Sequence, residues 1–372
     1  MTTCPSGPLA GIRVVDLGRF PPTAYCTRLL AQQGADICRV DSPGADPAMF
    51  GVGVGLSAGK RSVAVNLRHS RGNEVLRRLA GWADVLVENS RPGELDQRGF
   101  GYSHAVEEYP RLVWCSITGF GQDGPYALWP GHDLTYTAHS GLLAALESEM
   151  PWHPQMMLSV PLGAMMATVG ILSALHSRQT SGRGCHLDIS LSESATWLLS
   201  GFDVVINGPG FRIPESPDRR LYLCRDDRYI SVAAADPRTW AALCTGLGLE
   251  DLVDRRPAPE EWPEVTARMA RVFAERPAAD WVSELGPQGA AIGPVNVGAD
   301  LQADPQLQAR GTLVGVDGVV VPSNPIRIGS EAISPSASSA PVVGQHTRDL
   351  LLDAGYRSSE VDALVEEGVV SE

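Results

Sequence analysis

The chain has 372 residues, of which 44% are hydrophobic and 20% are charged, and its formal net charge is −13. This composition is that of an ordinary globular protein and excludes collagen-like and fully disordered classes. The negative charge disfavours a dedicated nucleic-acid binder and docking on an anionic membrane, because both targets are themselves negative. The length suggests two domains. A local basic pocket for a phosphorylated small molecule is compatible with this balance.

Segments that would direct the chain into or across a membrane are not expected. No stretch approaches the ~20 apolar residues of a membrane-spanning helix, and the lightly charged run Met156–Leu175 is predicted to be buried core. The N-terminus lacks the basic start and apolar centre of an export signal, which indicates a cytoplasmic protein. Seven cysteines without a C-x-x-C spacing indicate reduced thiols and neither a disulfide framework nor a metal site.

The first 200 residues alternate short apolar runs, which predict buried strands, with segments whose apolar residues recur at helical spacing. The predicted elements in chain order are strand Ile12–Leu17, helix Pro22–Gln33, strand Ala35–Asp41, strand Arg61–Leu67, helix Arg71–Trp82, strand Ala83–Glu88, strand Leu112–Thr118, helix Leu134–Leu146, helix Gly163–Gln179 and strand His186–Leu191. This alternation predicts an α/β fold in which helices cover both faces of a parallel sheet.

The pattern changes at the Gly- and Pro-rich segment Asn207–Pro217, where we place a domain boundary. Beyond it, a strand hairpin and two helices indicate a smaller α+β domain: Leu221–Cys224, Tyr229–Ala233, Trp240–Gly246 and Glu264–Arg276. A last helix, His346–Gly355, is expected to pack back on the first domain. We therefore predict a large domain of residues 1–205 and 325–372 and a small domain of residues 206–324.

The hexapeptide Gly119–Gly124 (GFGQDG) fits the G-x-G-x-x-G fingerprint of dinucleotide-binding proteins and follows a predicted strand. That fingerprint needs a helix that begins directly after it, because the helix N-terminus holds the phosphates. Pro125, Pro130 and Gly131 disfavour such a helix here. A dinucleotide site is therefore the less favoured interpretation of this loop.

Basic residues at the edges of the predicted elements can recruit an anionic ligand, although a solvated surface is the alternative interpretation for each of them. The segment Ser90–Gly93 (SRPG) is better placed than the others, because it directly follows a predicted strand. Ligands of open parallel sheets bind at the carboxyl ends of the strands. This loop is thus a candidate binding loop.

A histidine stands at the start of a predicted helix, in the sequence Gly131-His132-Asp133. Asp133 is a candidate N-cap of that helix. The positive end of a helix dipole favours a neutral imidazole, which is a usable general base at pH 7. A hydrogen-bonded structural histidine is the alternative interpretation. No nucleophile–histidine, Walker or zinc-protease motif occurs, so these residues indicate only an enzyme with an anionic small-molecule ligand.

Segments along nearly the whole chain resemble the family III CoA-transferases of the CaiB/BaiF type, which include the α-methylacyl-CoA racemases. The segments are GPLAGIRVVDLGRF, CTRLLAQQGADICRVDSPGADP, GKRSVAVNLR, ADVLVENSRPGELDQRGFG, LVWCSITGFGQDGPY, SRQTSGRGCHLDISLSES, LYLCRDDRYISVAAADPRTW and VGQHTRDLLLDAGY. The resemblance implies a large Rossmann-like domain plus a small α+β domain in an interlocked homodimer. It also implies an acyl-CoA thioester as substrate, with no permanently bound cofactor and no metal.

By motif position, the resemblance implies that residues of three loops line a CoA groove: Asn66, Leu67, Arg68, Ser90, Arg91, Pro92, Gly131, Asp133 and Tyr136. Ser42 stands where the racemase branch often has arginine, so one phosphate contact is expected to be missing. The loop around His132 resembles the racemase loop, with this histidine as the base. Asp236 falls where racemases carry a supporting glutamate, and it is expected to orient the histidine of the partner chain.

The catalytic aspartate of the resembled family is replaced. Its position falls on Val160, and no acidic residue occurs between Glu149 and Asp188. Valine can neither attack a carbonyl nor carry a proton, which disfavours an aspartyl-anhydride mechanism for this chain alone. Three interpretations remain: an acyl-CoA enzyme that uses His132 for racemase-like enolate chemistry, a CoA-transferase subunit that acts with an aspartate-bearing homologue, and a non-catalytic acyl-CoA binder.

Overall fold

The chain forms two compact units in the computed structural model: unit 1, which comprises Met1–Phe211 and Arg310–Glu372, and unit 2, which comprises Arg212–Ala309. The residues that the structure describes are 7–146, 153–201, 215–328, 331–332 and 339–372. The predicted boundary at residue 206 lies outside these ranges. The predicted division into domains therefore remains a prediction.

Unit 1 is built around a seven-stranded sheet with the spatial order β14-β3-β2-β1-β4-β5-β6. Its strands are β1 (Arg13–Asp16), β2 (Asp36–Asp41), β3 (Arg61–Val65), β4 (Val85–Glu88), β5 (Val113–Thr118), β6 (His186–Ser190) and β14 (Val370–Ser371). The first six are parallel to their neighbours, and β14 is antiparallel to β3. The predicted α/β fold with a parallel sheet is thus confirmed for these six strands, and the short antiparallel edge strand β14 is an addition.

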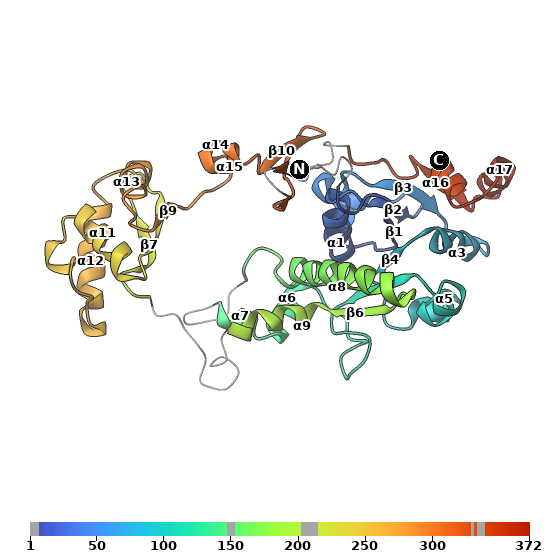
Figure 1. Ribbon diagram of the computed structural model, residues 1–372, viewed down its shortest axis with the longest axis horizontal. Coiled ribbons are helices and arrows are strands. Elements are labelled where there is room, and N and C mark those ends of the chain that lie inside the picture. The colour runs from blue at the N-terminus through green and yellow to red at the C-terminus, as the bar shows by residue number, and fades with distance from the viewer. Residues whose placement is uncertain (1–6, 147–152, 202–214, 329–330, 333–338) are drawn as a thin grey trace. The chain divides into compact units, whose positions relative to one another are not determined.

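Helices cover both faces of this sheet (Figure 1). One apolar core lies under α1 (Pro21–Gln32) and α8 (Ser159–Ser181). The other lies under α3 (Gly72–Trp82), α5 (Tyr102–Glu108), α16 (Thr347–Asp353) and α17 (Ser358–Glu366). Successive strand residues alternate between the two cores, so that Val14 faces α1 and Val15 faces α3. Because both faces of the sheet are buried, the residues of each central strand form a nearly continuous apolar run in the sequence.

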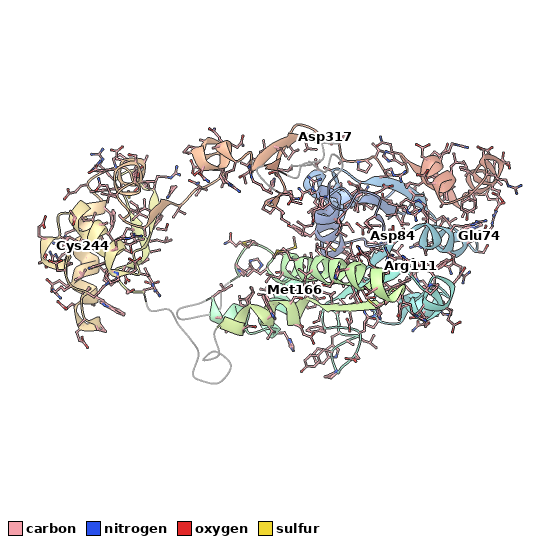
Figure 2. The ribbon with its side chains drawn as sticks, in the orientation of Figure 1. Glu74, Asp84, Arg111, Met166, Cys244 and Asp317 are labelled. Carbon is pink, nitrogen blue, oxygen red and sulfur yellow. The ribbon has the colours of Figure 1, made fainter. Side chains whose placement is uncertain are left out.

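The 23-residue helix α8 is long and apolar enough to cross a membrane, and half of its most apolar window is buried in the protein. The expectation that no such stretch exists is therefore corrected. The helix packs on α1, β5 and β6. Near its end, the guanidinium of Arg178 donates to the carboxylate of Asp84 and to the carbonyl of Arg111, at 3.0 Å each. Figure 2 labels these two partners beside the sheet of unit 1. The buried face of the helix, which includes Ala164, Ala167 and Ile171, supports the predicted role of the segment as core.

The predicted helix Leu134–Leu146 is interrupted. It forms α6 (Asp133–His139) and α7 (Leu142–Ala145), because Gly141 adopts a left-handed conformation with φ of 81° that an α-helix cannot continue. The shorter elements of unit 1 are η1 (Pro47–Phe50), α2 (Val54–Ser57), α4 (Glu94–Gln97), α9 (Leu191–Trp197), η2 (Leu198–Gly201), β10 (Leu313–Val316), β11 (Val319–Pro322), β12 (Arg327–Ile328) and β13 (Glu331–Ala332).

Unit 2 contains a three-stranded antiparallel sheet, in the order β7-β8-β9, with helices on one face. Its elements are β7 (Arg219–Leu223), β8 (Tyr229–Ala233), α11 (Pro237–Gly246), η3 (Glu250–Leu252), η4 (Pro259–Glu261), α12 (Trp262–Phe273), α13 (Ala278–Leu285), β9 (Ile292–Pro294), α14 (Asp300–Ala303) and α15 (Pro305–Ala309). Trp240 and Phe273 fill its core. Leu221 and Tyr229 on the other sheet face are 53% and 47% exposed.

The six cysteines in the described ranges are free thiols, and Cys4 lies outside those ranges. Burial raises the pKa of the Cys26 thiol to about 12, so this thiol is unreactive at neutral pH. Within the described residues, no cluster of His, Cys, Asp and Glu side chains is arranged to hold a metal ion.

Candidate active site

A cavity of about 650 Å³ lies at the carboxyl ends of β1, β2, β3 and β4 in unit 1. We call it the strand-end cavity. Residues that directly follow these strands form much of its wall: Leu17, Gly18, Arg19, Ser42, Pro43, Asn66, Leu67, Arg68, Asn89, Ser90 and Arg91. This is the edge of a parallel sheet at which ligands bind, because the loops that leave neighbouring strands meet there.

Arginine side chains give the strand-end cavity cationic groups that are available to a ligand. Arg39 is paired with Asp41, and Arg98 with Glu94. By contrast, Arg68 is exposed and forms no ion pair with the described part of the chain. Arg91 is likewise exposed and forms no ion pair with the described residues. Unpaired arginines in a cavity of an acidic protein favour an anionic ligand, and phosphate groups suit their planar donors.

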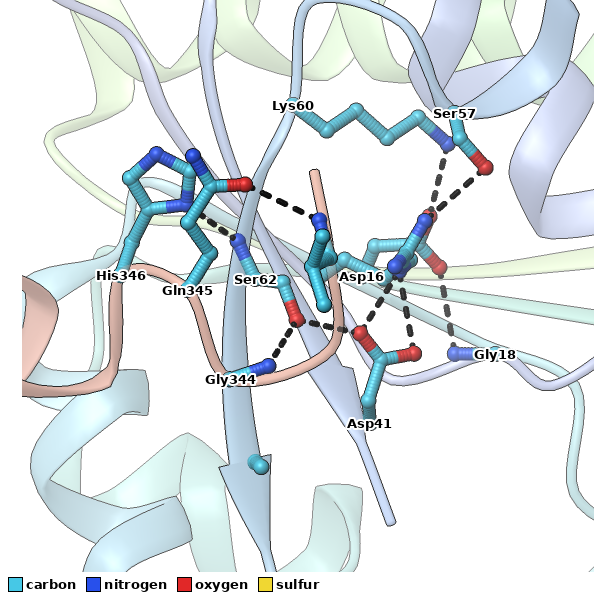
Figure 3. Close-up of polar contacts among 12 residues, drawn as sticks. Asp16, Gly18, Asp41, Ser57, Lys60, Ser62, Gly344, Gln345 and His346 are labelled. Atoms are coloured by element: carbon cyan, nitrogen blue, oxygen red, sulfur yellow. Dashed lines mark hydrogen bonds and ion pairs between the residues drawn. The ribbon is translucent and has the colours of Figure 1, made fainter. Parts of the chain in front are cut away.

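A buried polar network lies beneath the cavity (Figure 3). The Lys60 ammonium is completely buried and donates to the Thr27 hydroxyl at 2.7 Å and to the Asp16 carboxylate at 3.2 Å. Burial lowers the pKa of Lys60, and the charge of Asp16 opposes that shift. The other Asp16 oxygen accepts the Gly18 amide at 3.2 Å. The network thus fixes the turn after β1, where a Cβ on Gly18 would lie 1.8 Å from the Thr23 hydroxyl.

Arg39 and Asp41 of β2 continue the network. The Arg39 Nε donates to both Asp41 oxygens at 3.0 and 2.8 Å, and its Nη1 donates to Ser57 at 2.9 Å. Asp41 also accepts the Ser62 hydroxyl at 2.5 Å, and the Ser62 oxygen accepts the Gly344 amide at 3.0 Å. The segment that leads into α16 is therefore fastened to the floor of the cavity (Figure 3).

The loop around His132 does not line the strand-end cavity. His132 is the N-cap residue of α6, with extended backbone angles of −132° and 178°. Its imidazole is exposed and makes no hydrogen bond to the residues that the structure describes. The Tyr136 hydroxyl donates to the Gly131 carbonyl at 2.5 Å and closes the loop. The ring is thus free to accept a proton from a ligand.

The Asp133 carboxylate caps α8 and not the helix that it begins. Its Oδ1 accepts the Val160 amide at 2.8 Å and the Ser159 hydroxyl at 2.9 Å, and its Oδ2 accepts the Leu158 amide at 2.9 Å. The prediction that Asp133 is the N-cap of its own helix is therefore wrong. Both carboxylate oxygens are occupied by α8, because the first free amides of that helix lie beside the loop.

Val160, at the position where the resemblance predicts the family's aspartate, is bonded through its amide to this loop. Val160 is the second residue of α8, is 5% exposed and packs into the core under α1. Its amide bonds the side chain of the residue that follows His132. The imidazole and the valine therefore lie on two directly bonded segments.

The sequence model of the family described as CoA-transferase family III matches residues 9–347 of the chain. The chain belongs to CoA-transferase family III. It is 32% identical over 377 residues to the α-methylacyl-CoA racemase of Mus musculus, with 97% of each chain covered. It is 32% identical over 409 residues to the succinyl-CoA:(R)-benzylsuccinate CoA-transferase subunit BbsE of Thauera aromatica, with 96% and 97% covered. A CAIB/BAIF family protein from Brucella suis is 28% identical with a TM-score of 0.79, covering 94% of this chain and 100% of that one.

In this family III chain, five of the residues expected to contact CoA line the strand-end cavity: Asn66, Leu67, Arg68, Ser90 and Arg91. Pro92 is the next residue of the same loop and does not line it, whereas Gly131, Asp133 and Tyr136 belong to the His132 loop. Because Asp133 is occupied by α8, its side chain is not free for a ligand. The other assignments to CoA remain predictions.

Asp236 lies in unit 2 as the N-cap residue of α11. Its carboxylate is exposed and accepts the amides of Thr239 and Arg238 at 3.0 Å each. Hydrogen bonds from the Thr239 amide and hydroxyl lower the pKa of Asp236, so it is anionic at neutral pH. Its predicted action on a histidine of a partner chain remains a prediction.

Sequence reasoning missed a polar group on three strands beside the Ser90–Arg91 loop. Glu88 on β4, Ser116 on β5 and His186 on β6 are joined around a cavity of about 30 Å³. The signal that could have found them is the presence of polar residues inside otherwise apolar strand runs, since such groups are buried only with partners.

Proposed function

We propose that this family III protein is an acyl-CoA enzyme in which His132 moves a proton at the α-carbon of the thioester. The observation that carries the proposal is the imidazole of His132, which is exposed and makes no hydrogen bond to the described residues. The residue that follows it, Asp133, is bonded to the Val160 amide at the start of α8. The CoA portion is placed in the strand-end cavity, where Arg68 and Arg91 meet its phosphates.

The chemistry follows from the acidity of a thioester α-carbon. The imidazole of His132 takes the α-proton, the electron pair moves into the carbonyl, and an enolate forms. The same imidazole then returns a proton to the same face. The start of α8 carries Val160, whose side chain cannot supply a proton to the opposite face of the α-carbon. Exchange with retention of configuration is therefore favoured over full racemisation. Loss of one general acid–base typically costs about 10²–10⁴-fold in rate.

The test is deuterium incorporation from D₂O into the α-position of a 2-methylacyl-CoA, followed by mass spectrometry. The expected result is incorporation by the wild-type protein and loss of at least about 10²-fold in rate for His132→Gln. His139→Gln is the matched control, because this second exposed histidine of α6 rests edge-on against Phe120. Equal incorporation by His132→Gln and the wild type would refute the proposal, and CoA binding without any exchange would indicate a non-catalytic binder.

A second candidate is a subunit of a CoA-transferase that acts with an aspartate-bearing homologue. The buried Val160 favours it, and two similar proteins are named as transferase subunits, from Thauera aromatica and Chloroflexus aurantiacus. CoA exchange between two acids that requires both purified chains would support this candidate. The resemblance implies an interlocked homodimer in which Asp236 of one chain orients His132 of the other. This homodimer is part of the first proposal. Light scattering of the purified protein measures whether the chain is dimeric.

A further inference from the structure

A row of polar side chains crosses the sheet at the carboxyl ends of β4, β5 and β6. Glu88 is paired in register with Ser116, and Ser116 with Asp188. On the same face, the ring of His186 lies with its Nε2 2.9 Å from the Ser116 hydroxyl oxygen. The proposed proton transfer uses none of these residues.

The two carboxylates of this row hold the loops that follow β4 and β5. Glu88 accepts the Ser90 amide at 2.6 Å, and Asp188 accepts the Gln122 amide at 3.0 Å. Ser90 and Arg91 line the strand-end cavity. A hydrogen bond to an ionised carboxylate is stronger than one to a neutral acceptor. The position of the Arg91 loop therefore depends on the charge and the hydrogen bonds of Glu88.

Ser116 connects Glu88 to His186 through a hydroxyl group that has only one proton. Its oxygen accepts the Trp114 indole N–H at 3.2 Å and lies within hydrogen-bonding reach of Glu88. When His186 Nε2 is unprotonated, the hydroxyl donates to the ring. When His186 is protonated, the ring donates to the serine, and the hydroxyl turns to Glu88. Protonation of His186 thus gives the Glu88 carboxylate one more donor.

Ionisable groups face His186 from every element around it: Glu88 of β4, Arg91 of the following loop, Asp96 of α4, Tyr102 of α5 and Asp188 of β6. Burial lowers the pKa of His186, while the charges of Asp188 and Asp96 oppose that shift. Burial raises the pKa of Glu88, and hydrogen bonds from Ser116 and Ser90 oppose it. Because the ordinary pKa of histidine lies well above that of glutamate, we take His186 as the group that is protonated first.

The row borders the cavity of about 30 Å³, which has room for about one water molecule. The side-chain nitrogen of Gln122 in its wall is buried and has no partner among the described residues. A water in this cavity would accept a hydrogen bond from the Gln122 side chain.

We propose that His186 is a positioning residue that, through Ser116 and Glu88, makes the affinity of the strand-end cavity for CoA depend on pH. The inference rests on the proposed function only in assigning CoA to that cavity. The affinity is expected to rise as the pH falls below about 6.5, the ordinary pKa of histidine, because the imidazolium and the Ser116 hydroxyl then stabilise the ionised form of Glu88 that holds the Ser90 amide.

The test is titration calorimetry of CoA binding to the full chain between pH 7.5 and pH 5.5. His186→Gln keeps a hydrogen-bonding group beside Ser116 but cannot titrate, and His176→Gln on the exposed side of α8 is the matched control. We expect the wild type and His176→Gln to gain about threefold to tenfold more affinity than His186→Gln over this range. The phosphates of CoA titrate equally in all three proteins. Parallel profiles for wild type and His186→Gln would overturn the inference.

A second measurement needs no ligand. NMR of the wild-type protein labelled with ¹³C-histidine, compared with His186→Gln for assignment, is expected to show a His186 signal that titrates below pH 6.5. In Glu88→Gln the loss of a nearby negative charge is expected to move this titration to lower pH. An unchanged His186 titration in Glu88→Gln would refute the coupling, whatever the calorimetry shows. If the wild type bound no CoA at any pH, the proposed function would fail, while the NMR result would still decide the coupling.

Discussion

Replacing Asp133 by alanine removes the acceptor of three donors at the start of α8, namely the amides of Leu158 and Val160 and the hydroxyl of Ser159. A hydrogen bond to a charged acceptor contributes about 1.5–3 kcal/mol. A negative charge at a helix N-terminus adds about 0.3–1 kcal/mol. Because bonds that share one acceptor are not additive, we expect the free energy of unfolding to fall by about 2–4 kcal/mol.

Urea unfolding followed by far-UV circular dichroism measures this loss, and hydrogen exchange of the amides at residues 158–165 locates it at the first turns of α8. Asp133→Asn keeps one carbonyl oxygen, so we expect about half of the loss. Asp123→Ala, at an exposed position of the preceding loop, is the control and is expected to leave stability unchanged. A loss of less than about 0.5 kcal/mol in Asp133→Ala, with unchanged exchange in α8, would refute the assignment of this carboxylate as the cap.

Two further substitutions test the site and its support. Val160→Asp places a carboxylate in the first turn of α8, at the position expected for the family's aspartate. We expect it to increase epimerisation of a 2-methylacyl-CoA by about 10²-fold, as followed by chiral chromatography. An unchanged rate would show that position 160 is not that of the second base. Asp16→Asn leaves the Lys60 ammonium buried without its counter-charge, and we expect a loss of about 3–5 kcal/mol in the free energy of unfolding. The double variant Asp16→Asn/Lys60→Met should recover most of that loss in urea unfolding, whereas simple additivity would show that the pair is not coupled.

The sheet of unit 1 was predictable because a parallel sheet buried on both faces leaves continuous apolar runs in the sequence. The break at Gly141 was not, since a lone glycine is tolerated in many helices and only the backbone angle shows the interruption. The strand β14 is two residues long and is defined by its pairing with β3, so no local hydrophobic pattern in the sequence predicts it. Local sequence signals thus predicted the elements, and long-range pairing decided their ends.

The same division applies to the candidate site. The loop with Ser90 and Arg91 was predictable because loops after parallel strands gather at one edge. The partner of Asp133 was mistaken, because a first-turn aspartate is most simply assigned to its own helix, whereas the amides that it binds lie 25 and 27 residues later. The contact between Ser116 and His186 joins residues 70 apart, and nothing local in the sequence indicates it.

The row formed by Glu88, Ser116 and Asp188 also has a consequence for how the strands find their alignment. These side chains share a face with Trp114, whereas their immediate neighbours, such as Val87 and Cys115, enter the opposite apolar core. A slip of β4 or β6 by one residue would turn a carboxylate into that core, far from any donor. Burying an unpaired charge in this way is prohibitive, so misaligned sheets are rejected during assembly. The residues that hold the binding loops therefore also help to specify the register of the strands.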